Sequence, residues 1–216
     1  MSYYFPEGTR VYYSATFASA KTITAVTNAS PDAVATSTSH GYVDNDIILL
    51  DSGWEDADDS LWKVDQQDAN TFKILGLDSS NTTFYPAGSG TGSSQLVSSW
   101  VEVPQVLNVQ SSGGDPKFGV VEPLARRNAI SQFIGFNPVN ITLTLGHDPA
   151  NATYQSMLGY SRVGTKLAFK IVGGSGGVAY GYGQMGASEM PRYQRGQANS
   201  VDVAIAVQGR LISYSS

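Results

Sequence analysis

The chain contains no cysteine and only two histidines, and charged residues make up just 14% of it. Without cysteine there is no disulfide framework, no thiolate nucleophile and no zinc–thiolate site. No apolar run approaches the ~18 residues of a membrane-spanning helix. The first residues show no basic segment followed by an apolar run, so we expect neither a secretory signal nor a membrane protein. The net charge of −5 argues against a sequence-reading nucleic-acid binder, which presents basic patches to phosphates.

Glycine, serine and threonine are plentiful, which favours many short strands and turns over helical bundles. The 216 residues suffice for one large β domain or two smaller ones. Charge is unevenly spread, since residues 21–92 hold eleven acidic and three basic residues, a net charge of −8, whereas the rest of the chain carries +3. This asymmetry indicates two modules with different roles.

Residues 139–172 give the clearest pattern, a strand followed by one short helix and a second strand. The first strand alternates apolar and polar residues, as a strand with one buried face does. Asp148 is predicted as the N-cap of the helix, with Pro149 at its first position and Gly159 at its end. The apolar stripe of the helix comprises Ala150, Tyr154, Met157 and Leu158.

Residues 21–92 read as a separate unit of five short strands divided by turns. The segment PAGSGTGSS at its end is interpreted as a flexible exit linker. The strings SPDAVATSTSHGYVDNDIILLDSG and WKVDQQDANTFKILGLDSSNTTFYPAGSG resemble a small β module that recurs in phage virion proteins. Asn45 stands where that module usually has glycine. We therefore predict a small β-barrel-like module inserted at 21–92 of a domain made of residues 1–20 and 93–216.

The main domain is expected to begin with an arm and a strand carrying Val11, Tyr13, Ala15 and Phe17 on one face. WVEVPQVLNVQ is predicted as one strand, with Pro104 on the face opposite to Val101, Val103, Gln105, Leu107 and Val109, and the proline suggests an edge position. Residues 111–136 are predicted to form a long loop, and such loops are usually functional or ordered by a partner. Residues 173–177 predict a hairpin turn, and the final strand should bury Val201, Val203, Ile205 and Val207.

Candidate contacts between subunits lie in the opening arm and in the long loop. Aromatic residues of the arm could equally belong to a strand of their own domain, and both interpretations stay open. The loop combines charges with apolar anchors. The candidates are Tyr3, Tyr4, Phe5, Asp115, Lys117, Phe118, Arg126, Arg127, Phe133 and Phe136.

Three sequence patterns that could indicate a nucleotide-binding, cation-binding or catalytic site are better explained by structural roles. Residues 181–186 fit the dinucleotide spacing GxGxxG, but nothing predicts the helix that this motif should open. Residues 54–59 are acidic, and whether Asp56, Asp58 and Asp59 bind a cation stays open. His40 and His147 are dispersed and lack a convergent nucleophile. We therefore predict no catalytic residue, no cofactor and no enzyme.

From Trp100 onward the chain resembles the tail tube proteins, the major tail proteins of long-tailed phages. The resemblance lies in the order of elements: VLNVQSSGG, a long loop, VNITLTLGHDPANATYQSMLGYSRVGTKLAFKI, GGSGGVAYGYG and VDVAIAVQGRLISYS. It implies a β-sandwich with one flanking α-helix, whose subunits close into hexameric rings and stack into a tube for DNA ejection. The inserted module would decorate the outside or sit between rings.

The same resemblance implies the partners and the location. The chain would bind itself in rings and stacked tubes, contact a tape measure protein and a tail terminator, and let DNA pass without sequence-specific binding. It would be assembled in the host cytoplasm and reside in the virion tail. Two alternatives stay open: another tail or connector component, such as a terminator or baseplate protein, and a carbohydrate-binding sandwich that uses Trp54, Trp62 and Trp100 as stacking platforms.

Overall fold

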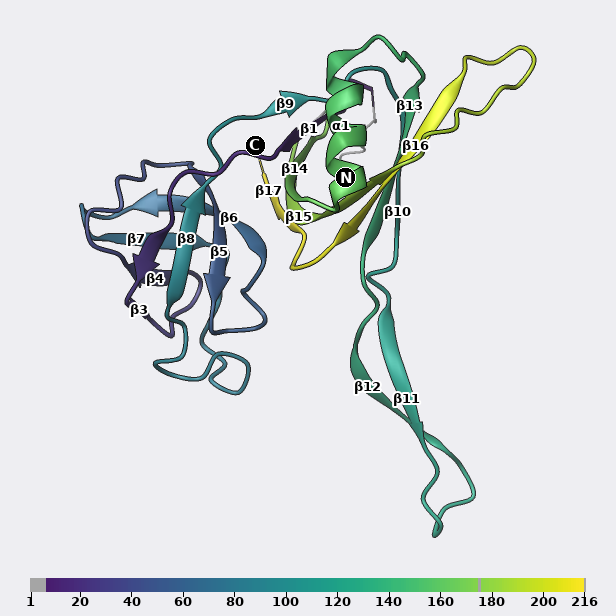
Figure 1. Cartoon of the computed structure of the whole chain (residues 1–216). Helices are drawn as coiled ribbons and strands as arrows, with labels where there is room; N and C mark the ends of the chain where they lie inside the picture. Colours follow the sequence, from purple (N-terminus) through teal and green to yellow (C-terminus); the bar gives the residue numbers. More distant parts are fainter. Residues whose placement is uncertain (1–6, 175, 216) are drawn as a thin grey trace.

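The computed structural model describes residues 7–174 and 176–215, and it is mainly β with one helix among them (Figure 1). An eight-stranded antiparallel sheet and the helix form what we call the body. Its strands are β1 (Arg10–Ser14), β9 (Val101–Glu102), β10 (Val106–Ser112), β13 (Asn140–Gly146), β14 (Lys166–Val172), β15 (Val178–Ala187), β16 (Ser200–Val207) and β17 (Ile212–Tyr214). The prediction of a mainly β fold with a short flanking helix is confirmed. No helix of the described residues is long and apolar enough to cross a membrane.

The sheet of the body folds over on itself. Its strands follow the order β10-β13-β16-β15-β14-β1-β9, with β17 on β15, yet only residues 103–105 connect β9 at one end to β10 at the other. The Val103 N–H donates to the Val11 carbonyl at 2.8 Å, and the Gly146 N–H donates to the Gln105 carbonyl at 2.9 Å. These bonds hold the two ends of the sheet together and enclose one core between two layers.

The single edge strand predicted for residues 100–110 is therefore wrong. Pro104 has no N–H to offer a ladder, and Gln105 adopts a left-handed φ of 55°. The chain turns there and changes layer, so β9 and β10 lie at opposite ends of the sheet.

The core of the body forms from alternate residues of its strands. Ile141, Leu143 and Leu145 of β13 are buried between the layers, as are the four predicted residues of β16. Val11 and Tyr13 of β1 face the same core. The period of two thus identified the buried faces of β13 and β16 correctly, but on the first strand it fails at Phe17, which follows the end of β1 and packs in another cluster, with Ala168 and Tyr182.

The helix α1 (Ala152–Val163) begins and ends later than predicted. Asn151 is the N-cap, because its side chain accepts hydrogen bonds from the N–H groups of Thr153 and Tyr154. The Asp148 side chain instead accepts from the Ala150 N–H at 3.0 Å, which forms a turn before the helix. Gly164, at a φ of 70°, ends the helix in place of Gly159.

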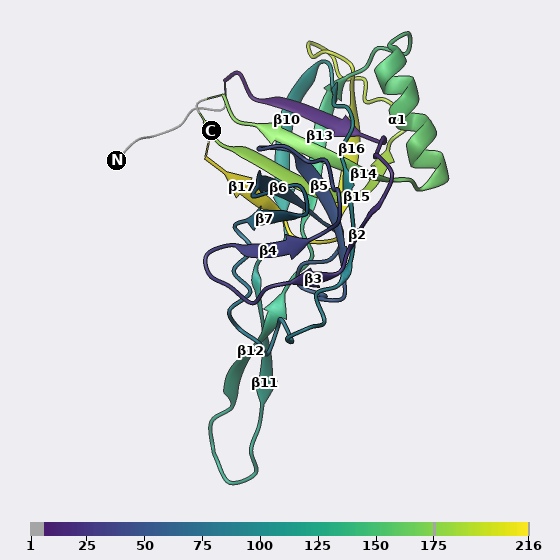
Figure 2. The ribbon, with the colours of Figure 1, turned by 90° about the vertical axis from the view of Figure 1, so that its left-hand side faces the viewer.

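The apolar stripe of α1 packs on the core as expected, with Tyr154, Met157 and Leu158 buried. Ala150, the fourth predicted member, is exposed because it precedes the helix. The helix covers one side of the body next to β15 (Figure 2).

A second sheet of seven strands, which we call the module, comprises residues 21–96 (Figure 1). In spatial order it contains β2 (Lys21–Ile23), β8 (Gly92–Leu96), β5 (Ile47–Ser52), β6 (Ser60–Gln66), β7 (Thr71–Leu75), β4 (Ala33–Thr36) and β3 (Ala25–Val26). It has its own core around Trp54, Trp62 and Phe72. The expected exit linker is partly wrong, because Gly92 and the two serines after it belong to β8, which hydrogen-bonds to both β2 and β5.

The module is attached to the outer face of β14 and β15 through a small apolar cluster. Ile47, Leu49 and Leu61 of the module pack against Ala168 and Tyr182 of the body. Where the chain enters and leaves the module, the two segments run side by side. Their backbones are joined by bonds from Ser98 N–H to the Thr16 carbonyl (3.0 Å) and from Ala18 N–H to the Leu96 carbonyl (2.8 Å).

The C-terminal segment also joins the two parts. The Tyr214 hydroxyl donates to the Leu75 carbonyl at 2.8 Å and accepts from the Lys63 N–H at 3.0 Å. Burial raises the pKa of Tyr214 to about 12. The Arg210 N–H donates to the Ser60 hydroxyl at 2.8 Å, and Lys166 forms a 2.8 Å ion pair with Asp59.

The long loop predicted at 111–136 is wrong in its local structure. Residues 111 and 112 complete β10, and most of the remainder forms the two-stranded sheet of β11 (Pro116–Val121) and β12 (Ile130–Phe136), which we call the hairpin. Figures 1 and 2 show the hairpin projecting from one end of the body.

Candidate assembly surfaces

The hairpin concentrates exposed apolar side chains. Half of the sixteen large hydrophobic residues that are exposed in the described chain lie between Pro116 and Phe136. Leu124, at the tip, is fully exposed, and Phe136 is 70% exposed. A two-stranded hairpin with no layer against it is marginal in water, and a large exposed apolar patch marks an interaction site. The hairpin is therefore the best candidate for a contact with another molecule.

Three phenylalanines form an aromatic row near the base of the hairpin. Phe118 lies opposite Phe133 in the ladder, with ring centroids 6.0 Å apart, and Phe133 contacts Phe136 at 5.2 Å. A register shift between Lys117 and Phe118 leaves Ile134 as an extra residue in β12. Such a bulge increases the twist of the ribbon, so apolar groups are presented on more than one side.

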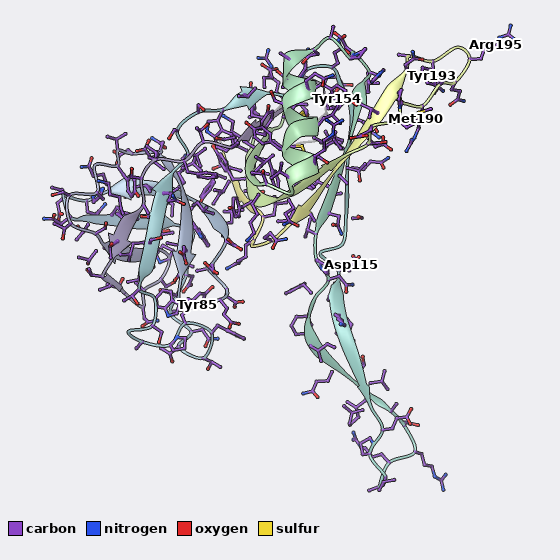
Figure 3. The ribbon with its side chains drawn as sticks, viewed as in Figure 1. Tyr85, Asp115, Tyr154, Met190, Tyr193 and Arg195 are labelled. Atoms are coloured by element: carbon purple, nitrogen blue, oxygen red, sulfur yellow. The ribbon has the colours of Figure 1, made fainter. Side chains whose placement is uncertain are left out.

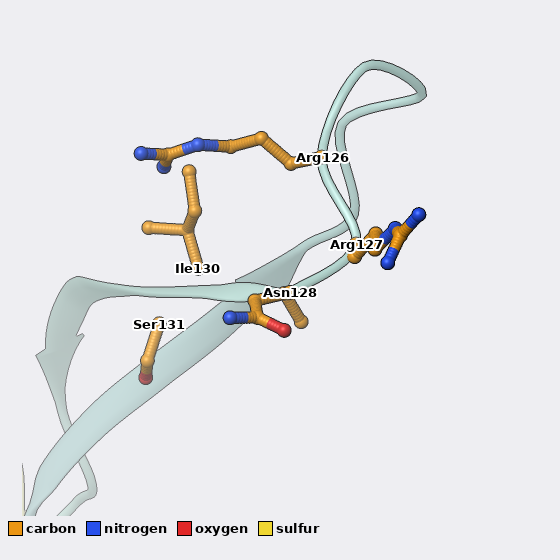
Figure 4. A pocket seen from close by; sticks show the side chains of 6 residues that line it. Arg126, Arg127, Asn128, Ile130 and Ser131 are labelled. Atoms are coloured by element: carbon orange, nitrogen blue, oxygen red, sulfur yellow. The ribbon is translucent and has the colours of Figure 1, made fainter.

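The tip of the hairpin carries two arginines. Arg126 extends over Ile130, whereas Arg127 points to the other side of the loop (Figure 4). Both belong to the wall of an open hollow of about 500 Å³ formed by residues 126–131. Among the ion pairs of the described residues none includes either arginine. The tip can therefore offer two unpaired positive charges to a partner.

The remaining predicted contact residues lie at the base of the hairpin or outside the described chain. The Asp115 carbonyl accepts a hydrogen bond from Asn137 N–H at 2.9 Å, which closes the base (Figure 3). Lys117 lies opposite Gly135 in the ladder and is exposed. The structure thus gathers all seven loop candidates on one projection. Tyr3, Tyr4 and Phe5 fall outside the described residues.

Sequence reasoning missed several exposed residues of this kind. Within the hairpin these are Val120, Val121, Leu124 and Ile130. The alternation of Phe118 with Val120 was a usable signal for a strand, but glycines within both strands obscured it. Outside the hairpin, Met190 and Tyr193 are exposed on the connection from β15 to β16, which extends away from the body (Figure 3).

The strand β10 forms a second candidate surface, because it is the end strand of the sheet. Within the part of the chain that the structure describes, β10 pairs with β13 alone. Leu107 is 57% exposed on it, and an open hollow of about 530 Å³ separates residues 106–109 from residues 7–9. Unpaired backbone groups along an end strand are a template for pairing with another chain.

The residues considered for chemistry have structural roles. His40 is buried, its Nδ1 accepts from the Tyr42 N–H at 3.0 Å, and its Nε2 lies 3.0 Å from the Asp68 carbonyl oxygen. The His147 ring packs edge-on against Tyr154 with centroids 5.7 Å apart. No nucleophile is paired with either ring in the hydrogen bonds of the described residues.

The glycine spacing at 181–186 belongs to the interior of β15 rather than to a phosphate-binding turn. A Cβ on Gly181 would lie 2.3 Å from the ring of Phe169, and one on Gly183 would lie 2.2 Å from the Ala206 carbonyl oxygen. Both glycines permit close packing within the body, which confirms the interpretation as a closely packed strand.

The acidic segment 54–59 is used in local contacts. An Asp58 carboxylate oxygen accepts from the Ser52 N–H at 3.0 Å, and Asp59 pairs with Lys166. Among the described residues, no group of three or more histidines or carboxylates converges as a metal site would. Asp56 lies in the wall of an open hollow near Phe84.

The tryptophans are not available as sugar-stacking platforms. Trp54 and Trp62 are both 1% exposed, in the core of the module. Trp100 is partly buried, lies 6.1 Å from the ring of Tyr180, and is covered by the Lys170 ammonium at 4.8 Å. Burial also lowers the pKa of Lys170. This packing weighs against the carbohydrate-binding alternative.

Among the described residues the conspicuous exposed surfaces are the apolar hairpin and the unpaired edge of β10, which are typical of a protein that assembles with others. Comparison with known families specifies the class. Residues 52–216 match the phage tail tube protein family, and because this match covers more than half of the sequence, the chain belongs to that family. It is thus a structural protein of the virion tail and not an enzyme.

Comparisons with individual proteins add little. A chain from the "Virion of native gene transfer agent (GTA) particle" is similar in structure, with a TM-score of 0.41 and 13% identity over 53% of this chain and 88% of that one. No curated protein matches the sequence.

Proposed function

We propose that the protein closes into hexameric rings that stack into the tail tube, and that this tube conducts DNA during ejection. The hairpin is the observation that carries the proposal. Its exposed phenylalanines contact only one another among the described aromatic pairs, and no second layer of the described chain covers them or Leu124. A neighbouring ring would bury them and stabilise a ribbon that is marginal by itself. The seven candidate contacts at the hairpin would then lie between rings, and subunit contacts of Tyr3, Tyr4 and Phe5, which lie outside the described residues, remain an expectation from the sequence.

Lateral closure of each ring would use the free edge of β10. Six copies that each contribute β10, β13, β16 and β15 would form a barrel of ~24 strands, with a circumference of ~115 Å at ~4.8 Å per strand. Barrels of roughly 16–18 strands already hold an aqueous channel. A ring of this size therefore leaves a channel, and it removes the strand edges that would otherwise pair at random.

The module would project outward from such a tube, since its net charge of −8 and its separate core make it a self-contained addition. A boundary at residues 20 and 92 for an independently folding unit remains a prediction, although the sheet itself extends to Leu96. A tape measure protein inside the tube, a terminator at its end and assembly in the host cytoplasm are further expectations from the family.

Another tail or connector component, such as a terminator or baseplate protein, is the remaining alternative. Such a component would form a single ring rather than a polymer. Electron microscopy of the purified chain separates the two: we expect hollow tubes of stacked rings with six-fold symmetry in end views. Isolated rings at all concentrations would favour the connector, and a monodisperse monomer would contradict both.

A further inference from the structure

The module exposes one large aromatic side chain. Phe84 is 60% exposed, whereas its neighbours Trp54 and Tyr85 belong to the core of the module. Phe84 lies in the wall of an open hollow of about 330 Å³, which we call the module hollow. Glu55 and Asp56 belong to the same wall, and neither takes part in an ion pair of the described residues. The module hollow thus combines an apolar surface with two negative charges.

The loop that carries Phe84 is firmly held. The Trp54 indole N–H donates to the Pro86 carbonyl at 2.8 Å, and the Trp54 and Tyr85 rings pack with centroids 5.3 Å apart. The Asn28 side-chain amide donates to the Tyr85 carbonyl at 2.8 Å. An exposed side chain on a loop that is already ordered loses less conformational entropy on binding. The module hollow is therefore suited to a partner that combines positive charge with an apolar group.

The tip of the hairpin has this complementary composition. Leu124 is fully exposed, and Arg126 and Arg127 take part in no ion pair of the described residues. Arginine binds carboxylates through paired hydrogen bonds. In its own chain the hairpin pairs only strand with strand, so its tip is available to another copy. A contact between two different surfaces joins successive copies into an open series, as a tube requires.

The hairpin is long enough for this contact. It continues the direction of β10 and β13, whose seven residues each span ~23 Å (Figure 1). From Pro116 to Leu124 the ribbon spans ~30 Å, so its tip reaches past the near end of a stacked body. Tyr85, next to Phe84, lies toward the same end of the molecule as Asp115 at the base of the hairpin (Figure 3). A shift by about one body length therefore brings the tip of one copy to the level of the module hollow of the next.

We propose that the hairpin tip docks in the module hollow of a second copy in the neighbouring ring, where its two arginines face the two carboxylates and Leu124 packs on Phe84. This inference rests on the proposed tube and names the partner of the tip. Modules with a net charge of −8 repel one another when rings stack, and the arginines would offset that repulsion. The phenylalanine row at the base drives assembly, so the tip contact strengthens tubes that also form without it.

The absence of cysteine allows a direct test by cross-linking. Leu124→Cys/Phe84→Cys places one thiol at the tip and one in the module hollow. Leu124→Cys/Ala69→Cys is the matched control, with the second thiol at another exposed turn of the module. In tubes, a short bifunctional maleimide should join the first variant into covalent series of more than six chains. The control tubes and the unassembled protein of either variant should give none.

Each other result of the cross-linking has a definite meaning. Series that stop at six chains would place the contact within one ring, and the inference would be wrong. Tubes with no cross-link, or with as much cross-linking in the control, would show that the tip does not dock in the module hollow, while the tube itself stands. If the wild-type chain forms no tubes, the proposed function fails.

An exchange of charges tests the same contact independently. Arg126→Glu/Arg127→Glu and Glu55→Arg/Asp56→Arg should each raise the protein concentration at which half of the chains are in tubes by about tenfold, because attraction becomes repulsion. All four substitutions together should restore most of the wild-type value. Asp44→Arg, at another exposed turn of the module, is the control and should change little. If the combined variant assembles no better than either reversal, the charges do not face each other and the inference is wrong.

Discussion

The hairpin and the module both extend from the body, but they treat their apolar side chains in opposite ways. The module encloses Trp54, Trp62 and Phe72 within its own sheet. The hairpin has two strands that no other described part of the chain covers, so its phenylalanines remain exposed to water. The module is further joined to the body by Tyr214, Arg210 and Lys166, whereas the described contacts of the hairpin run through its two connecting segments.

The two parts therefore obtain their stability from different sources. The module buries its large hydrophobic residues in its own core, so it is expected to be rigid in the unassembled protein. In the proposed tube the hairpin would gain this free energy on association, so we expect assembly to depend on it.

Replacing Phe118 and Phe133 with aspartate should abolish tube formation. Both side chains are more than half exposed, so the monomer loses little core packing and should keep its melting temperature. In the assembled state each carboxylate would be buried without a partner, which is strongly unfavourable. Sedimentation and electron microscopy measure assembly. Phe84→Asp, at a residue of the module that is 60% exposed, is the matched control and should leave assembly intact.

Removing the module should weaken the body without unfolding it. Because Phe17 and Val97 form a bridge at the entry, residues 18–96 can be replaced by an Asn-Gly turn. Tyr182 and Ala168 would then lose their cover, and we expect the free energy of unfolding to fall by roughly 3–5 kcal/mol. Urea unfolding measures the loss, and tubes should still form. Aggregation of the shortened chain would show that the module is an integral part of the body.

Tyr214→Phe should loosen the module from the body. The change leaves the Leu75 carbonyl and the Lys63 N–H without their shared partner, at a cost of about 1–3 kcal/mol. The weaker attachment should appear as faster amide hydrogen exchange in β6 and β7. Tyr193→Phe, at a residue 67% exposed, is the control and should have no effect.

The same hydroxyl predicts a pH dependence. Folding raises the pKa of Tyr214 from 10.0 to about 12, because burial disfavours the phenolate. The stability that this residue contributes is complete below pH 10 and is lost as the pH rises towards 12. Between pH 10.0 and about pH 12 the attachment of the module to the body should therefore weaken in the wild-type protein. In a Tyr214→Phe protein it should weaken less over the same pH range.

The ion pair between Asp59 and Lys166 should matter least. Both side chains are more than a third exposed, and such pairs contribute at most about 1 kcal/mol. Asp59→Asn keeps a residue that tolerates the left-handed φ of 47° found there. The stability change should shrink further in high salt. If Asp59→Asn lowered the free energy of unfolding as much as Tyr214→Phe does, charge rather than packing would hold the module on the body.

Local signals in the sequence were informative wherever burial alternates regularly. The core residues of β13 and β16, the buried stripe of α1 and the close packing at Gly181 were all predictable, because period and residue size reflect the immediate environment. The cap of α1 was misassigned because Asp148 and Asn151 are both good N-cap residues, and in the structure Asp148 forms the turn before the helix while Asn151 caps it. The hairpin was missed because Gly119 and Gly135 interrupt its two strands and obscure the short alternation of Phe118 with Val120.

The sequence by itself determined the mainly β composition, the inward residues of the long strands and the family to which the chain belongs. Only the tertiary structure decided how these strands lie together. Three residues carry the chain between the two ends of the body's sheet, and β8 completes a sheet that the linker composition concealed. Local patterns report which side of a strand is buried, but pairing between residues distant in sequence depends on the whole chain closing around its cores.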